Sequence, residues 1–370
     1  MRQRGFHAIV PAGGAGTRLW PLSRSGQPKF LLDLTSSGRS LIQQTVERLT
    51  PVAESVTVVT GVAHAEAVIA QLPGLPADAV LAEPSPRDSA AAICLATAVI
   101  AQRHPGAVIG SFAADHVIRD VPAFHRAVVE AVAAAREGEL VTIGIAPDHP
   151  STAFGYIKPG EQLKVDGAPS AVRVDAFVEK PDAETAAQYV SDGYRWNAGM
   201  FVARADVLLD LLAQNRPALH KGVLELAQAW DTADRAEALE RLWPTLEKVA
   251  IDYAVAEPAA AAGRVAVVPA GIGWDDIGDF SALAPQLPDV QAGDEDRSAL
   301  HILGDVDDVL ALDSSGVVVA RSGRKITLLG VDDIVVVDTA DAILVTTRDR
   351  AQEVKDVVAE LRKQGSTDLV

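Results

Sequence analysis

Short runs of β-branched and apolar residues alternate with alanine-rich amphipathic stretches over the first two-thirds of the chain. The runs predict strands at 7–10, 55–60, 79–82, 107–112, 140–145 and 172–179. The stretches between them predict helices at 40–49, 64–70, 89–103, 123–136 and 183–190. Ser89 is expected to be the N-cap of the third helix. This alternation predicts an α/β fold with a Rossmann-like, mostly parallel sheet and helices on both faces.

The pattern continues with helices expected at 206–213 and 223–242, a strand at 265–268 and a turn at 271–280. It breaks down at 285–296, where Pro, Gly, Gln and Asp gather without an apolar period, and a linker is predicted there. Short strands follow at 309–313, 316–320, 326–329, 334–338 and 342–346, before an amphipathic helix at 349–364. Regularly spaced short strands indicate a small β-solenoid or sandwich.

These patterns predict two domains, an α/β domain at 1–288 and a small β domain at 298–370. The strands of the second domain carry apolar residues on both faces, which about 70 residues cannot bury alone. We therefore expect the small domain to pack on the first domain and to contribute to a homodimer, without supplying a catalytic group.

Composition narrows the class of protein. With 48% hydrophobic and 22% charged residues the chain has the balance of a globular protein. Its single cysteine, Cys94, cannot form an internal disulfide, and no apolar stretch follows Met1 as in a signal peptide, so a cytoplasmic location is expected. No run reaches the roughly 18 apolar residues of a membrane span. A net charge of −17 argues against a nucleic-acid partner.

A basic glycine loop directly follows the first strand. Residues 11–24 read PAGGAGTRLWPLSR, and the first 32 residues hold five Lys or Arg but no Asp or Glu. Glycines let backbone N–H groups turn toward an anion, and Arg18, Arg24 and Lys29 are expected to supply charge. A dinucleotide fingerprint would need glycine in place of Leu19, and a P-loop would end in Gly-Lys-Ser/Thr. The loop therefore predicts a phosphate site of another type.

The loop, with its later Pro28-Lys29, resembles the signature loop of the sugar-nucleotide pyrophosphorylases. Its Leu-Trp-Pro-Leu-Ser-Arg form is similar to the mannose-1-phosphate guanylyltransferase branch, as is the segment VAIDYA at 249–254. The resemblance extends over nearly the whole chain. It implies a nucleotidyltransferase, GT-A-like catalytic fold and a short left-handed β-helix-like C-terminal region, in a short form without an isomerase domain.

The resemblance also implies the reaction of GTP with α-mannose 1-phosphate to give GDP-mannose and pyrophosphate, with Mg²⁺. An oxygen of the sugar phosphate is already an anion, so catalysis needs positioning and charge neutralisation rather than a general base. Arg18, Lys29 and Lys180 are the expected catalytic cations. Two alternatives stay open: a uridylyl- or adenylyltransferase acting on another hexose 1-phosphate, and a non-catalytic regulator that binds a sugar nucleotide.

Two aspartates are the expected metal ligands. Asp115 follows the strand at 107–112, and ligands of open α/β sheets collect at the carboxyl ends of strands. The resemblance places the family's metal aspartate at Asp115 and its partner at Asp276, in the segment WDDIG at 274–278. Magnesium usually takes only one or two protein carboxylates. Asp275 is the alternative if the alignment is displaced by one residue.

The nucleotide is expected at two segments. The resemblance assigns it to the signature loop, through Ala12, Gly13, Gly14, Gly16, Thr17 and Arg18, and to the segment after the third strand, through Glu83, Arg87 and Ser89. Guanine presents adjacent N1–H and N2–H donors, and one carboxylate can accept both, so Glu83 is a candidate for choosing the base. A loop with a helix cap is the alternative. Asp88, where the family commonly has Asn, has no assigned role.

The sugar phosphate is expected at three further segments. Glu179-Lys180-Pro181 resembles the family's Glu-Lys-Pro, which implies that Lys180 meets the phosphate and Glu179 accepts sugar hydroxyls. Asn197 and Gly199 match its Asn-Ala-Gly segment, and Gly155 matches another sugar-side glycine, beside Phe154 where Tyr is more usual. For Asp252 packing or a helix start is as good an interpretation as a role in the site.

Overall fold

The computed structural model describes residues 2–14, 16–291 and 299–370. The chain forms two compact units: unit 1 comprises residues 1–13, 45–114 and 118–274, and unit 2 comprises residues 14–44, 115–117 and 275–370. The basic glycine loop at 11–24 is called the signature loop from here on. Most of it belongs to the same unit as the C-terminal strands. The domain boundary is expected between 288 and 298, and the expected linker ends at 296. Both extend into residues 292–298, which lie outside the described residues, so the boundary stays a prediction.

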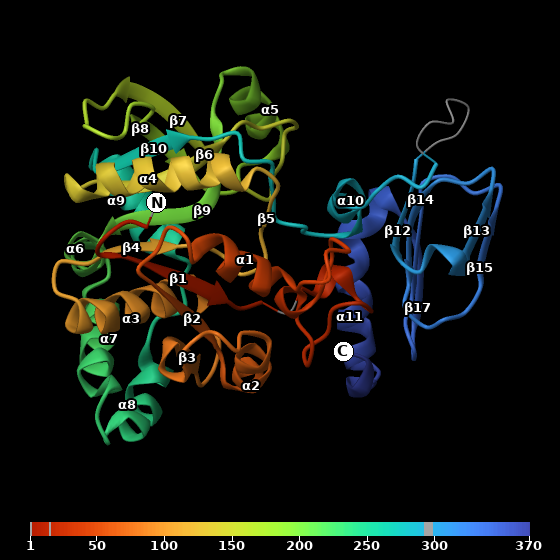
Figure 1. Ribbon diagram of the computed structural model, residues 1–370, viewed down its shortest axis with the longest axis horizontal. Coiled ribbons are helices and arrows are strands. Elements are labelled where there is room, and N and C mark those ends of the chain that lie inside the picture. The colour runs from red at the N-terminus through yellow and green to blue at the C-terminus, as the bar shows by residue number, and fades with distance from the viewer. Residues whose placement is uncertain (1, 15, 292–298) are drawn as a thin grey trace. The chain divides into compact units, whose positions relative to one another are not determined.

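Unit 1 is built on one nine-stranded sheet (Figure 1). Its order is β3 (Val80–Glu83), β2 (Ser55–Gly61), β1 (Phe6–Ala12), β4 (Val108–Ser111), β9 (Arg195–Arg204), β6 (Leu140–Ile145), β10 (Val265–Pro269), β8 (Val172–Val178) and β7 (Gly155–Gln162). The first four strands are parallel, as are β6 and β10, but β9 runs antiparallel to both β4 and β6. The predicted α/β class is confirmed, with a sheet that is mixed.

Helices cover both faces of this sheet because neighbouring residues of a strand point to opposite sides. Ile9 and Ile109 belong to the core cluster of α3 (Asp88–Arg103), over which α6 (Ala205–Asn215) and α7 (Pro217–Trp230) pack. On the other face Phe124 of α4 (Val121–Arg136) meets Phe112 edge to face. Unit 1 also contains α2 (Val62–Gln71), α5 (Ala183–Ser191), α8 (Arg235–Leu242) and α9 (Glu257–Ala261), and α1 (Leu41–Leu49) begins in unit 2 and ends in unit 1.

Several local predictions differ from the structure. The strand at 300–304 was not predicted, and residues 348–353, at the start of the helix expected at 349–364, form a 3-10 helix. The helix expected at 223–242 is two helices, because α7 ends at Trp230 and the Thr232 hydroxyl bonds the Ala229 carbonyl before α8 begins. Strands β7 and β9 were not predicted, since glycine and polar residues such as Asn197 interrupt their apolar pattern. Ser89 is not an N-cap: α3 begins at Asp88, and the Ser89 hydroxyl accepts from the Ile251 N–H.

The C-terminal part of unit 2 has the predicted β-helix-like architecture. Strands β12 (Leu300–Gly304), β14 (Gly316–Ala320) and β16 (Ile334–Asp338) are parallel, β17 (Ile343–Thr347) is antiparallel to β16, and β13 (Val309–Leu312) pairs with β15 (Ile326–Leu329). A short α10 (Phe280–Leu283) precedes them and α11 (Val354–Lys363) closes the unit. Short strands β5 (Val117–Ile118) and β11 (Trp274–Asp275) lie where the chain passes from one unit to the other.

The strands of unit 2 bury apolar residues on both faces, as the sequence predicts. Val317 and Val319 of β14 share a core with Leu19 and Leu22 of the signature loop. Val318, between them, faces a second core inside the β-helix-like region. Residues of the signature loop and of α10 and α11, all in the same unit, thus cover the outer face. In the described part of the chain, no helix combines the length and the apolar character that crossing a membrane requires.

Gly316 offers a test of this architecture. Its φ is +133°, and a Cβ there would lie 2.0 Å from the Ile334 carbonyl oxygen of the neighbouring strand. Gly316→Ala should lower the free energy of unfolding by at least about 2 kcal/mol, since it adds backbone strain to a clash with fixed backbone. Urea unfolding of unit 2, followed through Trp20 fluorescence in chains lacking the other tryptophans, measures the loss.

Gly323→Ala is the matched control, because Gly323 also has a positive φ, +74°, but a Cβ there would meet no atom within 4 Å. Its cost should stay near about 1 kcal/mol, the strain alone. Equal losses in the two variants would contradict the close approach of β14 and β16.

Candidate functional site

The signature loop is folded tightly on itself. Gly16 has a φ of +58°, and a Cβ there would lie 2.7 Å from the Ser23 hydroxyl oxygen and 3.0 Å from the Lys29 Cβ. The Ser23 hydroxyl donates to the Gly16 carbonyl at 2.9 Å, and Thr17–Leu19 forms one 3-10 turn. Gly14, at φ +87°, is exposed, with open space where a Cβ would lie. Only glycine allows the close return of the chain at position 16 and leaves the backbone at position 14 accessible.

Lys29 joins three stretches of unit 2. The side chain is largely buried, and its ammonium lies 2.7 Å from Oδ2 of Asp115. It also donates to the carbonyl of Asp276 at 2.5 Å. Arg18 donates to the Gly278 carbonyl two residues further on, at 3.5 Å. Four residues that the sequence analysis singled out, Arg18, Lys29, Asp115 and Asp276, are therefore gathered within one unit.

The two carboxylates differ in their electrostatics. Burial alone raises the pKa of Asp115, but the charges of Lys29 and His116 outweigh it and leave that pKa below its ordinary value, so Asp115 is ionised at neutral pH. Burial raises the pKa of Asp276, and the negative charge of Asp115 raises it further, against the lowering by Lys29 and Arg18. A second cation at this pair would favour the ionised form of both.

This pair of acids fits a magnesium ion in its donor chemistry, because Mg²⁺ prefers carboxylate oxygens and usually keeps several ligands from phosphates and water. Over residues 2–14, 16–291 and 299–370, no group of three or more His, Cys, Asp or Glu side chains is placed to bind a metal. A metal here would thus depend on substrate phosphates and water for its remaining ligands.

The neighbouring Asp275 is engaged in holding the turn. Its Oδ1 accepts from the Ile277 N–H at 2.7 Å, and its Oδ2 accepts from the Gln286 amide at 2.8 Å. Asp276 instead lies within the electrostatic reach of Lys29, Asp115 and Arg18. The geometry therefore favours Asp276 over Asp275 as the acid of the site.

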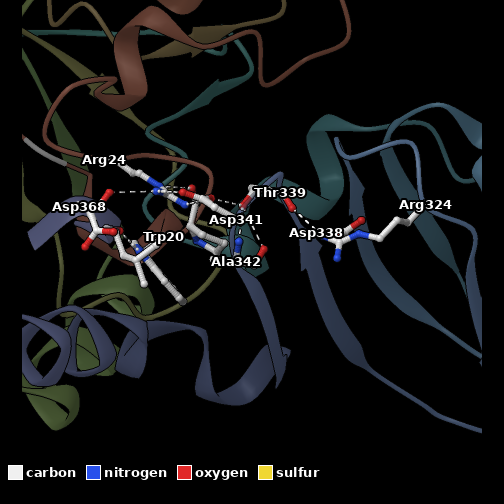
Figure 2. A network of polar contacts seen from close by, with 10 residues as sticks. Trp20, Arg24, Arg324, Asp338, Thr339, Asp341, Ala342 and Asp368 are labelled. Carbon is white, nitrogen blue, oxygen red and sulfur yellow. Dashed lines mark hydrogen bonds and ion pairs between the residues drawn. The ribbon is translucent and has the colours of Figure 1, made fainter. Parts of the chain in front are cut away.

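Arg24, from which the sequence analysis expects charge for an anion, is paired with a carboxylate. Both terminal nitrogens of its guanidinium bond the two carboxylate oxygens of Asp341, at 2.7 and 2.5 Å (Figure 2). Lys29 is likewise paired, with Asp115, so the expectation that these cations supply charge for an anion stays a prediction.

In unit 1 the expected base-binding segment follows β3. Burial raises the pKa of Glu83 to about 7, and its Oε2 is buried without a hydrogen-bond partner among the described residues. Most buried polar atoms are hydrogen-bonded, so a carboxylate oxygen left in this way is suited to a donor from a ligand. Asp88, at φ +62°, is exposed.

Arg87 and Ser89 tie this segment to residues 246–251. Arg87 donates to the Leu246 carbonyl at 3.2 Å, and the Ser89 hydroxyl accepts from the Ile251 N–H at 2.9 Å. Ala12, at the end of β1, is buried, and its carbonyl accepts from the Thr60 hydroxyl, whereas the following Gly13 is exposed. Of the expected nucleotide residues in unit 1, Gly13 is exposed, and Glu83 and Arg87 each have a buried side-chain atom, Oε2 and Nε, without a hydrogen-bond partner among the described residues.

The expected sugar segments of unit 1 meet around Glu179. A Cβ on Gly155 would lie 2.3 Å from Glu179 Oε2, so glycine is what makes room for this carboxylate. Glu179 Oε1 pairs with the Lys180 ammonium at 3.2 Å, while its Oε2 is buried without a partner in the described part of the chain. Burial, and then the charge of Asp252, raise the pKa of Glu179 to about 7 despite Lys180. The Lys180 side chain is 57% exposed and can reach a ligand.

Asn197 organises this group from within. Its amide nitrogen donates to Asp252 Oδ1 at 2.8 Å, and its amide oxygen accepts from the Thr142 hydroxyl and from the Gly199 N–H. Gly199 has a φ of +65°, which the bond to Asn197 helps to fix. Asp252, for which the sequence analysis had no role, therefore orients Asn197.

Two contributors to this group had no role in the sequence analysis, which did not name Glu257 and named Phe154 only as the neighbour of Gly155. Glu257, at the start of α9, accepts from the Glu179 N–H at 3.1 Å. Phe154 lies edge to face against Trp196 and Trp274, with ring centroids 5.0 and 5.1 Å apart, so that its ring is fixed next to Gly155. The similarity of the segment at 249–254 was the only signal toward Asp252, and no local pattern pointed to Glu257, because the partners come from distant elements.

Paired acids, the cations Arg18 and Lys29 and a glycine loop form an arrangement whose chemistry is suited to phosphate groups. Residues 7–292 match the family described as nucleotidyl transferase, and residues 307–361 match the MannoseP isomerase/GMP-like beta-helix domain. The chain belongs to the nucleotidyl transferase family and is an enzyme of that family.

Comparison with individual relatives shows which members of the family the chain is similar to. The chain is 38% identical to mannose-1-phosphate guanylyltransferase of Escherichia coli K12 over 99% of its own length and 75% of the relative's. It is 39% identical to xanthan biosynthesis protein XanB of Xanthomonas campestris, over 97% of its own length and 74% of the relative's. A crystal structure from Thermus thermophilus, titled mannose-1-phosphate geranyltransferase, superposes with a TM-score of 0.83 at 33% identity, over 97% of this chain and 99% of that one. The resemblance to the mannose-1-phosphate guanylyltransferases is thereby confirmed.

The paired acids give a test by isosteric substitution. Asp115→Asn and Asp276→Asn should each lower turnover by roughly 100-fold or more, since each removes one of two charges that can hold the metal. Asp275→Asn should chiefly lower the melting temperature, because its oxygens hold the turn. Steady-state rates at several Mg²⁺ concentrations and thermal unfolding separate the two effects. Full activity of Asp276→Asn with an inactive, stably folded Asp275→Asn would move the site by one residue.

The raised pKa of Glu83 predicts a pH dependence of stability. A carboxyl whose folded pKa is about 7 instead of 4.5 favours the folded state below pH 4.5, and this contribution is lost as pH rises toward 7. Relative to Glu83→Gln, which does not titrate, the unliganded native chain should therefore lose melting temperature between pH 5 and pH 8. Glu66 is exposed, so Glu66→Gln is the control, and its melting temperature should change with pH in the same way as that of the native chain. A constant difference between Glu83→Gln and the native chain over this range would contradict the burial of that carboxyl.

Proposed function

We propose that this enzyme transfers the guanylyl group of GTP to α-mannose 1-phosphate, which gives GDP-mannose and pyrophosphate. The observation that carries the proposal is the gathering of Lys29, Asp115 and Asp276 beside Arg18 on the signature loop. Similarity to the Escherichia coli guanylyltransferase over 99% of the chain supports the choice of substrates.

The proposed reaction needs no enzyme nucleophile. An oxygen of the sugar phosphate forms a bond to the α-phosphorus of GTP, the bond from that phosphorus to the β-bridging oxygen breaks, and pyrophosphate leaves with the electron pair. Because the attacking oxygen is already anionic, the enzyme acts by orientation and charge neutralisation. Arg18, Lys29 and Lys180 are the proposed cations for this task.

Asp115 and Asp276 would hold the magnesium ion. When bound, such an ion neutralises phosphate charge and orients the phosphates. Lys29 contributes to this arrangement in the free protein, since it keeps Asp115 ionised and bonds the backbone of the residue that carries the second carboxyl. The residues of the chain thus provide a charged pair before any ligand enters.

Two buried carboxyls are the proposed specificity groups. The free Oε2 of Glu83 can accept guanine N–H donors, and the free Oε2 of Glu179 can accept sugar hydroxyls. Both have a pKa near 7, so donors from a ligand would favour their charged forms. Lys180, beside Glu179, would meet the phosphate of the sugar. A cytoplasmic location and a homodimer stay predictions.

Pyrophosphate release across four nucleotides and several hexose 1-phosphates tests the proposal. GTP with mannose 1-phosphate and Mg²⁺ should be the preferred combination. Glu83→Gln presents an NH₂ to a guanine donor and should weaken GTP affinity by about 1–3 kcal/mol, the usual cost of an unpaired buried polar group.

Equal or faster turnover of UTP with glucose 1-phosphate would contradict the choice of substrates while leaving the family unchanged. Binding of GDP-mannose without turnover of any pair would instead indicate a regulator. Unchanged GTP affinity of Glu83→Gln would move base recognition away from this carboxyl.

A further inference from the structure

We propose that the C-terminal region of unit 2 positions the signature loop for nucleotide binding through a loop clamp. The loop clamp consists of Trp20 and Arg24 on the loop, Asp341 after β16, and the backbone carbonyls of Asp368 and Leu369 (Figure 2). The inference rests on the proposed function, because it assigns positioning residues for the same reaction.

The contacts of the loop clamp come from two places in the C-terminal region. Arg24 makes two parallel bonds to Asp341, at 2.7 and 2.5 Å, and reaches the Asp368 carbonyl at 3.5 Å. The indole N–H of Trp20 donates to the Leu369 carbonyl at 2.6 Å. Trp20 is buried, in the core that also contains Val317 and Val335. The loop is thus held at two points four residues apart.

Trp20 and Arg24 lie on either side of Ser23 in the sequence, and Ser23 bonds the glycine part of the loop. Ser23 lies between them, and its hydroxyl donates to the Gly16 carbonyl. Arg24 also exchanges two backbone hydrogen bonds with Gln27, and its Nε donates to the Pro21 carbonyl. Lys29 follows directly after this turn. A shift of Trp20 or Arg24 would therefore displace both the glycine cradle and the buried ammonium.

Asp341 is itself prepared for this contact. The Thr339 hydroxyl donates to Asp341 Oδ1 at 3.2 Å and to the Ala342 carbonyl, within the turn between β16 and β17. Hydrogen bonds from Arg24 hold the pKa of Asp341 below its ordinary value, so it is charged at neutral pH.

The surroundings show that the pair orients the loop and does not mainly stabilise the fold. Arg24 and Asp341 line a cavity of about 550 Å³ together with Leu32, Arg321 and Thr339. Their side chains are 18% and 50% exposed, and an ion pair with one partner half exposed to solvent contributes about 1 kcal/mol or less to stability, with bidentate geometry at the upper end. Bidentate geometry nevertheless fixes the direction of the guanidinium. Loss of the pair should therefore loosen the loop with little effect on global unfolding.

The experiment compares Asp341→Asn and Trp20→Phe with Asp333→Asn in the full chain. Asp333 is 54% exposed and pairs with Arg348 at 3.4 Å in the same unit, at the opposite end of β16 from Asp341, so it is a matched control for an exposed ion pair. Hydrogen exchange of residues 16–31 is measured without substrate, together with melting temperature and the KM of each substrate.

In Asp341→Asn and Trp20→Phe the amides of the loop should exchange several-fold faster. The nucleotide KM should rise about fivefold or more, with kcat and the sugar-phosphate KM changing less. Asp341→Asn and the control should melt at nearly the native temperature. The double variant Arg24→Gln/Asp341→Asn should be no worse than the more impaired single variant, because both remove the same contact.

Native exchange in the loop of Asp341→Asn would overturn the clamp, and faster exchange with an unchanged nucleotide KM would overturn its positioning role. If the native protein turned over no nucleotide, the proposed function would fail by itself. The exchange data, combined with nucleotide affinity measured by calorimetry, would then still decide the inference.

Discussion

The buried ammonium of Lys29 is the interaction on which the proposed phosphate site of this enzyme depends. It contacts an acid that follows a strand of the sheet and a carbonyl in the segment from 274 to 278, far along the chain. Two neighbouring carboxyls would otherwise repel each other. Burial raises the pKa of Asp276, and the negative charge of Asp115 raises it further. One cation therefore keeps Asp115 charged and brings the second acid into the same group before any substrate or metal enters.

In unit 1 the acids of the proposed site are buried carboxyls that lack full hydrogen bonding, not acids paired with a buried cation. Glu83 and Glu179 each leave one buried oxygen without a partner in the described structure, and burial raises the pKa of both to about 7. Unpartnered buried acceptors destabilise a fold, so their presence is best explained by ligand donors that satisfy them. Around Glu179 the fold makes specific room for this arrangement, through Gly155 and through an Asn197 amide that Asp252 and Thr142 hold in place.

The β-helix-like region contributes to more than its own fold. Alternate residues of β14 enter two separate cores, and one of these cores contains the apolar residues of the signature loop. The same region supplies Asp341 and two backbone carbonyls to the loop. Packing and polar contacts together make this region a support for the signature loop, which explains why the compact units do not follow the order of the chain.

The sequence by itself determined the fold class, most strands and helices, and the residue types of the site, because apolar periodicity and motif spacing are local properties. It led to Lys29, Asp115 and Asp276 through a resemblance, since nothing local connects positions so far apart. Only the tertiary structure decided that Asp275 holds a turn, that Asp252 orients Asn197, and that Arg24 is paired with Asp341. It also decided that β9 lies in the middle of the sheet. In each case the partner comes from a distant segment, and long-range pairing leaves no periodic signal in the chain.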